Sequence, residues 1–298
     1  MVNFVVSSTI SHNFNEILLK EGEGMSTNYP LTDSHFEQLV EDGYVILKEY
    51  IPKDELAILQ AAQRSVLKTW EEVKENPPTS RAQLIPYPYQ NVMMSKLYLE
   101  PDLIDFGRRY LKTQYVQIRV GNMIARYPGF KSQDAGHIDN GNNSLLPKSE
   151  SCREFGQIVF WIHLEETTAN QAPLLLVKKK YGNDLSKAEP FVCPAGSIAI
   201  FSNYTFHASS SFNGQDGQRF TWAFMLGRAD HPFEGLLNYT ALGINPIFKQ
   251  VISSLTPSER TLFCFPPPGH HYYTKQTLKA LEEQYPGFNK NKTYKPVG

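Results

Sequence analysis

The pattern of apolar and polar residues divides the chain into a helical first part, a β-rich middle and a helical end. In the first part, apolar residues recur at helical spacing between good N-caps and breaking Gly or Pro residues. The expected elements are a helix from Thr32 or Asp33 to Asp42-Gly43, a strand at 44–47, a helix from Pro52 to about Val73 and a helix at 101–111. These elements should cover one side of a β-core.

The middle of the chain, from about residue 115 to 228, has the pattern of β-strands. Short β-branched and aromatic runs alternate there with Gly, Asn and Pro, and no helical pattern is sustained. The clearest runs lie at 116–120, 123–127, 158–161, 196–201 and 219–226. This spacing favours an all-β barrel or sandwich with flanking helices.

The end of the chain returns to helix, at 257–263 after the N-cap Thr256 and at 274–284 after the N-cap Thr274. We find no internal repeat, low-complexity tract or linker. We therefore expect a loosely ordered leader at 1–30 and a single domain at 31–298, with a β-core at about 115–228 and a C-terminal helical extension at about 235–298.

The composition and charge of the chain limit the kinds of molecule that it is expected to bind. The chain has 298 residues and a net charge of −1, from 29 Lys and Arg against 30 Asp and Glu, so no basic field favours nucleic acid or an anionic membrane. Its three cysteines form no C-x-x-C pair, which favours a reducing compartment. No signal peptide or membrane-length apolar run is apparent. We expect a cytoplasmic protein, monomeric or homodimeric, that acts on a small molecule.

The candidate chemistry centres on His137-x-Asp139, which is followed about 70 residues later by His207. Residues i and i+2 of a strand point to the same face, so His137 and Asp139 can aim at one point. Two imidazoles and a carboxylate suit divalent iron and leave coordination positions open. Arg219 opens a further apolar strand, which we expect to pair with the strand bearing His207. Its guanidinium could make a two-pronged contact with a carboxylate beside the metal.

Several stretches together resemble the phytanoyl-CoA dioxygenase family of Fe(II)/2-oxoglutarate oxygenases. They are His137-x-Asp139, the segment 161–166, the turn 194–197, His207-x-Ser209, Arg219 and the helix-strand-helix region 31–56. The resemblance implies a double-stranded β-helix, the jelly-roll or cupin-like core. It also implies a hydroxylase in which His137, Asp139 and His207 bind iron, 2-oxoglutarate and O2 are co-substrates, and Arg219 holds the far carboxylate of 2-oxoglutarate.

Three further residues match the family's co-substrate pocket. Ser209 shares a face with His207 and could donate a hydroxyl bond to the same carboxylate. Trp161 resembles an aromatic lining residue, and Arg126 matches a basic position that in some members touches the co-substrate. Two of them also have a purely structural interpretation, Ser209 as an ordinary strand serine and Trp161 as a core tryptophan.

Two other classes of protein stay open from the sequence. One is a jelly-roll binding protein that has lost turnover. The other is a zinc hydrolase at the same residues, for which Asp134 is the one candidate general base. The histidines outside the motif, His163, His231, His270 and His271, are expected to be solvated or hydrogen-bonded. The polar loop at 140–153 is the candidate lid.

Overall fold

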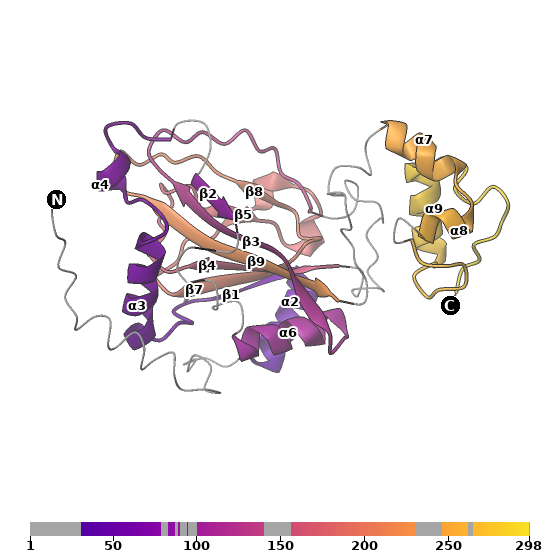
Figure 1. The fold of residues 1–298 in the computed structure, drawn as a ribbon, viewed down its shortest axis with the longest axis horizontal. Helices are drawn as coiled ribbons and strands as arrows, with labels where there is room; N and C mark the ends of the chain where they lie inside the picture. The colour runs from indigo at the N-terminus through magenta and orange to yellow at the C-terminus, as the bar shows by residue number, and fades with distance from the viewer. Residues whose placement is uncertain are drawn as a thin grey trace, which may run out of the picture.

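The protein is described from a computed structural model, which defines residues 31–78, 83–86, 89, 94, 100–139, 156–229, 246–261 and 265–297. The expected leader at 1–30 and the expected lid at 140–153 lie outside these residues. The described part contains two antiparallel sheets, helices beside the larger sheet, and a separate cluster of C-terminal helices (Figure 1).

The larger sheet has six strands in the order β1-β7-β4-β9-β3-β2, and the smaller has three in the order β6-β5-β8. The strands of the larger sheet are β1 (Tyr44–Leu47), β2 (Gln83–Pro86), β3 (Val116–Arg126), β4 (Ile158–His163), β7 (Ser197–Ser202) and β9 (Arg219–Arg228). Those of the smaller sheet are β5 (Leu174–Leu176), β6 (Glu189–Pro190) and β8 (His207–Ser209). Two 3-10 turns, η3 (Lys179–Tyr181) and η4 (Leu185–Lys187), connect β5 to β6.

The two faces of the larger sheet bury different residues because side chains alternate along a strand. In β4, Phe160 and its even-numbered neighbours join the main core under the helices, whereas Val159 and Trp161 join the cluster shared with the smaller sheet. Leu174 and Leu176 of β5 complete that inner cluster. The fold is therefore mainly β, with a jelly-roll core and flanking helices, as the sequence predicts.

Three helices of the first part pack against the main core: α2 (Asp33–Asp42), α3 (Lys53–Arg64) and α6 (Pro101–Leu111). Thr32 caps α2, and Gly43 ends it with φ 88, a left-handed conformation that costs glycine little. The bounds of α2, β1 and α6 confirm the sequence prediction.

The expected helix from Pro52 to Val73 is wrong, because the chain forms α3 and then a short α4 (Trp70–Val73). The Ser65 hydroxyl donates to the Ala62 carbonyl at the end of α3. Thr69 then donates both its N–H and its hydroxyl to the Glu72 carboxylate, which starts a new helix. Trp70 still reaches the core, where its ring stacks on Tyr127.

The C-terminal helices have a core of their own, formed by α7 (Pro246–Ser254), α8 (Pro257–Arg260) and α9 (Lys275–Gln284) with the segments after them. Buried Arg260 organises it: the guanidinium donates to the carbonyls of Ile252 and Phe288 and lies 4.0 Å from the Phe288 ring centre. Helices α8 and α9 begin where the sequence predicts, after Thr256 and Thr274. Helix α7 was not predicted. Whether these helices and the sheets form one domain stays a prediction.

No helix in the described parts of the chain combines the length and the apolar character that crossing a membrane requires.

Candidate metal centre and co-substrate pocket

The two histidines of the candidate centre are joined through their backbones. His137 and His207 each donate an N–H to the other's carbonyl, both at 2.9 Å, in an isolated antiparallel bridge. Residues paired in this way carry their side chains on the same face. The two imidazole rings accordingly lie 4.4 Å apart, centre to centre.

Asp139 completes the cluster. Its Oδ1 lies 3.6 Å from His137 Nε2 and 3.8 Å from His207 Nε2. One ligand atom from each of the three residues lies within 4.8 Å of the others. Donors bound at about 2.1 Å to one ion are about 3 Å apart at right angles, so a small closure would let all three share a divalent metal.

The local structure around His137 differs from the prediction. His137 and Asp139 do not lie on a strand, because His137 forms a single bridge and Asp139 follows in a bend. Their side chains converge all the same. His207 does begin β8, as predicted.

Both imidazoles are oriented through their Nδ1 atoms. His207 Nδ1 lies 2.9 Å from the Thr205 carbonyl oxygen, which can only accept, so Nδ1 carries the proton and Nε2 keeps its lone pair. His137 Nδ1 lies 3.1 Å from Asp134 Oδ1. Burial opposes the ionisation of Asp134, but the N–H groups of Ser209 and Gly136 and the His137 ring outweigh it and lower its pKa. Sequence reasoning weighed Asp134 solely as a general base and missed this contact, although Asp-x-Gly is a known turn signal.

Two arginines lie side by side on the inner face of the larger sheet. Arg126 of β3 pairs in register with Arg219 of β9. Among the described residues, Nε of Arg219 and both Nε and Nη1 of Arg126 are buried without a hydrogen-bond partner. Burial and the charge of Arg126 lower the pKa of Arg219 to about 9, and burial lowers that of Arg126 to about 10. Arg219 is buried, and Arg126 is half-buried with its guanidinium 4.2 Å from the Phe130 ring centre. Two neighbouring cations with buried N–H groups are costly unless an anion joins them.

The prediction that the strand of Arg219 pairs with that of His207 is wrong. Strand β9 pairs with β3 and β4 in the larger sheet, whereas β8 pairs with β5 in the smaller one. The sandwich brings the two sheets together face to face, and local sequence patterns cannot specify that arrangement. Arg219 does open its strand as expected.

Other polar atoms on this inner face also lack partners within the described structure. They are Trp161 Nε1, His163 Nε2 and Thr221 Oγ1. Trp161 lies near Phe201, whose ring centre is 5.3 Å from that of His207. His163 donates Nδ1–H to the Phe220 carbonyl, and burial and Arg219 lower its pKa to about 3, so the imidazole is neutral. It is hydrogen-bonded, not solvated. Sequence reasoning did not single out Thr221, which lies two residues beyond Arg219.

The Ser209 hydroxyl is already engaged. Its Oγ lies 2.6 Å from Ser132 Oγ, and its backbone N–H donates to Asp134 Oδ2. Ser209 therefore connects β8 to the segment that leads into His137. A hydroxyl oxygen in this pair still has capacity for a further hydrogen bond.

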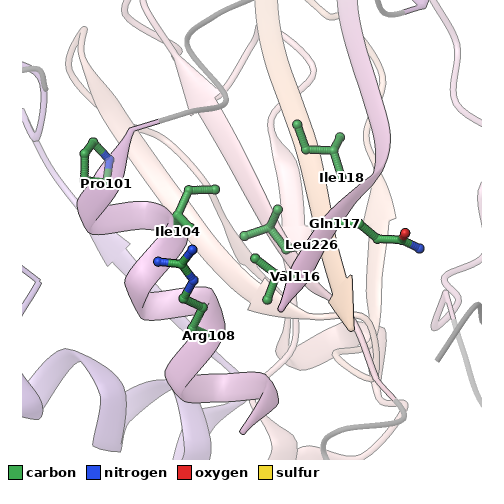
Figure 2. Close-up of a pocket in the computed structure, with 7 residues that line it drawn as sticks. All are labelled: Pro101, Ile104, Arg108, Val116, Gln117, Ile118 and Leu226. Atoms are coloured by element: carbon green, nitrogen blue, oxygen red, sulfur yellow. The ribbon is translucent and has the colours of Figure 1, made fainter. Parts of the chain in front are cut away.

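A cavity of about 490 Å³ lies elsewhere, between α6 and the adjacent ends of β3 and β9 (Figure 2). Ile104, Val116, Ile118 and Leu226 make it mainly apolar, and the Arg108 guanidinium at its edge is bonded to Asp105 and to the Gln114 carbonyl. None of the seven candidate residues lines this cavity, so it is not the candidate centre.

Several solved structures resemble this fold. The chain superposes on EctD from S. alaskensis with bound Fe (TM-score 0.54, 16% identity, covering 74% of this chain and 86% of that one). It also superposes on the non-haem α-ketoglutarate-dependent carbocyclase SnoK from nogalamycin biosynthesis (0.52, 15%, 70% and 88%). A third is HygX from Streptomyces hygroscopicus with nickel and 2-oxoglutarate bound (0.51, 13%, 70% and 93%).

The fold is thus one that solved non-haem α-ketoglutarate-dependent enzymes adopt. At these identities the likeness defines the fold and not the activity. No family model matches the chain, and no curated protein matches it in sequence.

Proposed function

We propose that this protein is a non-haem Fe(II)/2-oxoglutarate-dependent dioxygenase that oxidises an unactivated C–H bond of a small molecule, with release of succinate and CO2. One observation carries the proposal. His137 Nε2, His207 Nε2 and Asp139 Oδ1 converge in a fold whose inner face also holds Arg126 and Arg219, and both arginines have buried N–H groups without a hydrogen-bond partner in the described structure. The resemblance to the phytanoyl-CoA dioxygenase family supports it.

The residues fit ferrous iron. Two neutral imidazoles and one carboxylate form the facial set that non-haem iron accepts, and the Nδ1 protons on both rings leave both Nε2 lone pairs free for the metal. When bound together, iron, 2-oxoglutarate and O2 supply the oxidising power, which no side chain of this protein can provide. The His137 side chain is 40% exposed, so this side of the centre is open to solvent.

Arg219 binds the far carboxylate of 2-oxoglutarate in this proposal. The site is buried, and a charge-assisted bond there is stronger than in water. Arg126, next to it in register, supplies further N–H donors, and the hydroxyl of Thr221, two residues along β9, is a neutral partner. We also assign the Ser209 hydroxyl to this carboxylate. Trp161 walls this space and can donate through Nε1.

The alternatives receive less support. A hydrolase would need a free general base, but Asp134 already accepts from Gly136 N–H, Ser209 N–H and the His137 ring. A binding protein without turnover would have no need to keep three ligand atoms converging in a fold whose inner face also carries Arg126 and Arg219. SnoK is a carbocyclase, and EctD has been solved with 5-hydroxyectoine. The same oxidation can end in hydroxylation, desaturation or ring closure, and hydroxylation is the outcome that we propose.

The test begins without oxygen. We expect the apoprotein to bind one Fe(II), and the addition of 2-oxoglutarate to produce a visible charge-transfer absorption. Admission of O2 should then convert 2-oxoglutarate to succinate, even if slowly without the main substrate. Iron binding without the absorption band or succinate would favour the binding protein. Hydrolytic activity with zinc and no use of 2-oxoglutarate would overturn the proposal. Cytoplasmic location and the monomeric or dimeric state stay predictions.

A further inference from the structure

We infer that Asp134 is a positioning residue for the metal centre, which holds His137 in the tautomer and orientation that aim Nε2 at the ion. The inference rests on the proposed metal site and deepens it, because it concerns a residue outside the ligand set. Asp134 is not a ligand in this arrangement, since its carboxylate lies on the Nδ1 side of the ring.

The carboxylate is fixed by the backbone before it reaches the imidazole. Asp134 Oδ1 accepts the Gly136 N–H at 3.0 Å, which closes a turn over two residues, and Oδ2 accepts the Ser209 N–H at 2.9 Å. Gly136 has φ 91, and a Cβ there would lie 2.4 Å from the Phe206 ring, so only glycine fits the turn. The turn is thereby attached to β8, the strand that carries His207.

His137 Nδ1 is the third donor to this carboxylate, 3.1 Å from Oδ1. Because an ionised carboxylate can only accept hydrogen bonds, the ring must carry its proton on Nδ1, and Nε2 is left with the lone pair. One carboxylate therefore sets the turn, the attachment to β8 and the direction of the ligand. A carboxylate behind a metal-bound histidine also raises the basicity of the imidazole.

The two histidines are supported differently. Behind His207 stands a neutral carbonyl, that of Thr205, whereas behind His137 stands a charged carboxylate. Hydrogen bonds to an ionised acceptor are about twice as strong as neutral ones. His137, with a side chain 40% exposed, is also less confined by packing than His207, at 9%. The stronger support thus belongs to the ring that packing holds less firmly.

Asp134→Asn is the informative variant. It keeps the size of the side chain but must aim an NH2 group at one of three donors. If the NH2 group takes the place of Oδ1, His137 can accept from it only by moving its proton to Nε2, which blocks the metal. If the NH2 group takes the place of Oδ2, it opposes the Ser209 N–H, and His137 keeps only a neutral amide oxygen, a weaker acceptor than the carboxylate. Ser132→Ala is the matched control, because Ser132 Oγ accepts the Asp134 N–H in the same turn and does not contact the imidazole.

The measurement uses Co(II) and the full-length protein without co-substrate. We expect Asp134→Asn to weaken Co(II) binding roughly 10- to 100-fold and Ser132→Ala to leave it within about threefold. In proton NMR of the Co(II) protein, the wild type should show two exchangeable, paramagnetically shifted imidazole N–H signals. Asp134→Asn should remove one or speed its exchange with water, and leave the signal of His207 in place.

The outcomes separate this inference from the proposed function. A wild type without metal binding or imidazole signals would refute the metal site itself. Metal binding and both signals unchanged in Asp134→Asn would refute the positioning role alone. Equal losses in Asp134→Asn and Ser132→Ala would assign the effect to the turn and likewise overturn the role of the carboxylate.

Discussion

The two faces of the larger sheet are built from the same strands but carry different kinds of residue. On the helix side, Phe160, Trp222 and Phe224 are fully buried among apolar neighbours, and the Phe160 and Phe224 rings stack at 4.6 Å. On the inner side, Arg219 and Thr221 alternate with Trp222 and Phe224 along β9, and each holds a buried polar atom that has no hydrogen-bond partner in the described part of the chain. The helix side of these strands is filled by apolar contacts, whereas the inner side presents hydrogen-bond donors that a bound anion could use.

This difference separates stability from function along a single strand. Burial of apolar area on the helix side stabilises the fold. Buried donors on the inner side cost stability until an anion accepts from them. Substitutions on the two faces should therefore change different measurements, and each of the following predictions tests that separation.

The largest effect is expected at the candidate ligand. Asp139→Ala should abolish succinate formation, because it removes a proposed metal ligand. The loss of activity should exceed the roughly 10- to 100-fold loss expected when a residue behind a ligand is changed. The apoprotein should unfold as the wild type does, as measured by chemical denaturation, because Asp139 lies outside both sheets. Asp105→Ala, in an exposed pair with Arg108 on α6, is the control and should leave turnover unchanged. Substrate-dependent succinate formation with unchanged iron affinity in Asp139→Ala would count against the ligand role.

The next effect is on the helix side. Phe224→Ala should lower the free energy of unfolding by about 3–5 kcal/mol, because it removes a ring from the centre of the main core. Measured by urea titration, this loss should occur without a change in metal affinity wherever the protein remains folded. Metal affinity that falls in step with stability would show that the two faces are not separable.

Arg219→Leu is the corresponding change on the inner side. We expect the Kd for 2-oxoglutarate, measured by anaerobic titration of the Fe(II) protein, to rise about 100-fold because a buried charge partner is lost. The apoprotein should be as stable as the wild type or more so, since an unpaired buried cation is removed. Arg228→Leu, at the other end of β9, removes an arginine that donates to the carbonyls of Leu111 and Lys112 and should not alter the Kd. An equal effect of both variants would refute the assignment.

The smallest effect concerns pH. His163 has a folded pKa of about 3, below its ordinary value near 6.5, so between these values the unfolded chain binds more protons and stability falls as pH falls. His163→Gln removes this contribution. Below pH 6.5 the unfolding free energy of the wild type should fall relative to that of the variant, by at most about 1.4 kcal/mol per pH unit. Parallel stability curves from pH 7.5 to 5 would contradict a buried neutral imidazole.

Local patterns predicted what depends on near neighbours. Thr32 and Gly43 bound α2, Pro101 begins α6, and His207 and Arg219 each open a strand, as the sequence indicates. The break between α3 and α4 was missed, because apolar spacing continues through Val66 and Trp70 while the Thr69 and Glu72 contact that divides the helix was not weighed.

The sequence by itself determined the fold class, the order of the candidate ligands along the chain and the strands that His207 and Arg219 open. Only the tertiary structure decided that β8 and β9 belong to different sheets, that Arg126 stands beside Arg219, and that Asp134 lies behind His137. The reason is that spacing along a strand or helix specifies a face within one element. Contacts between elements depend on pairing across the sandwich, which joins residues far apart in the chain.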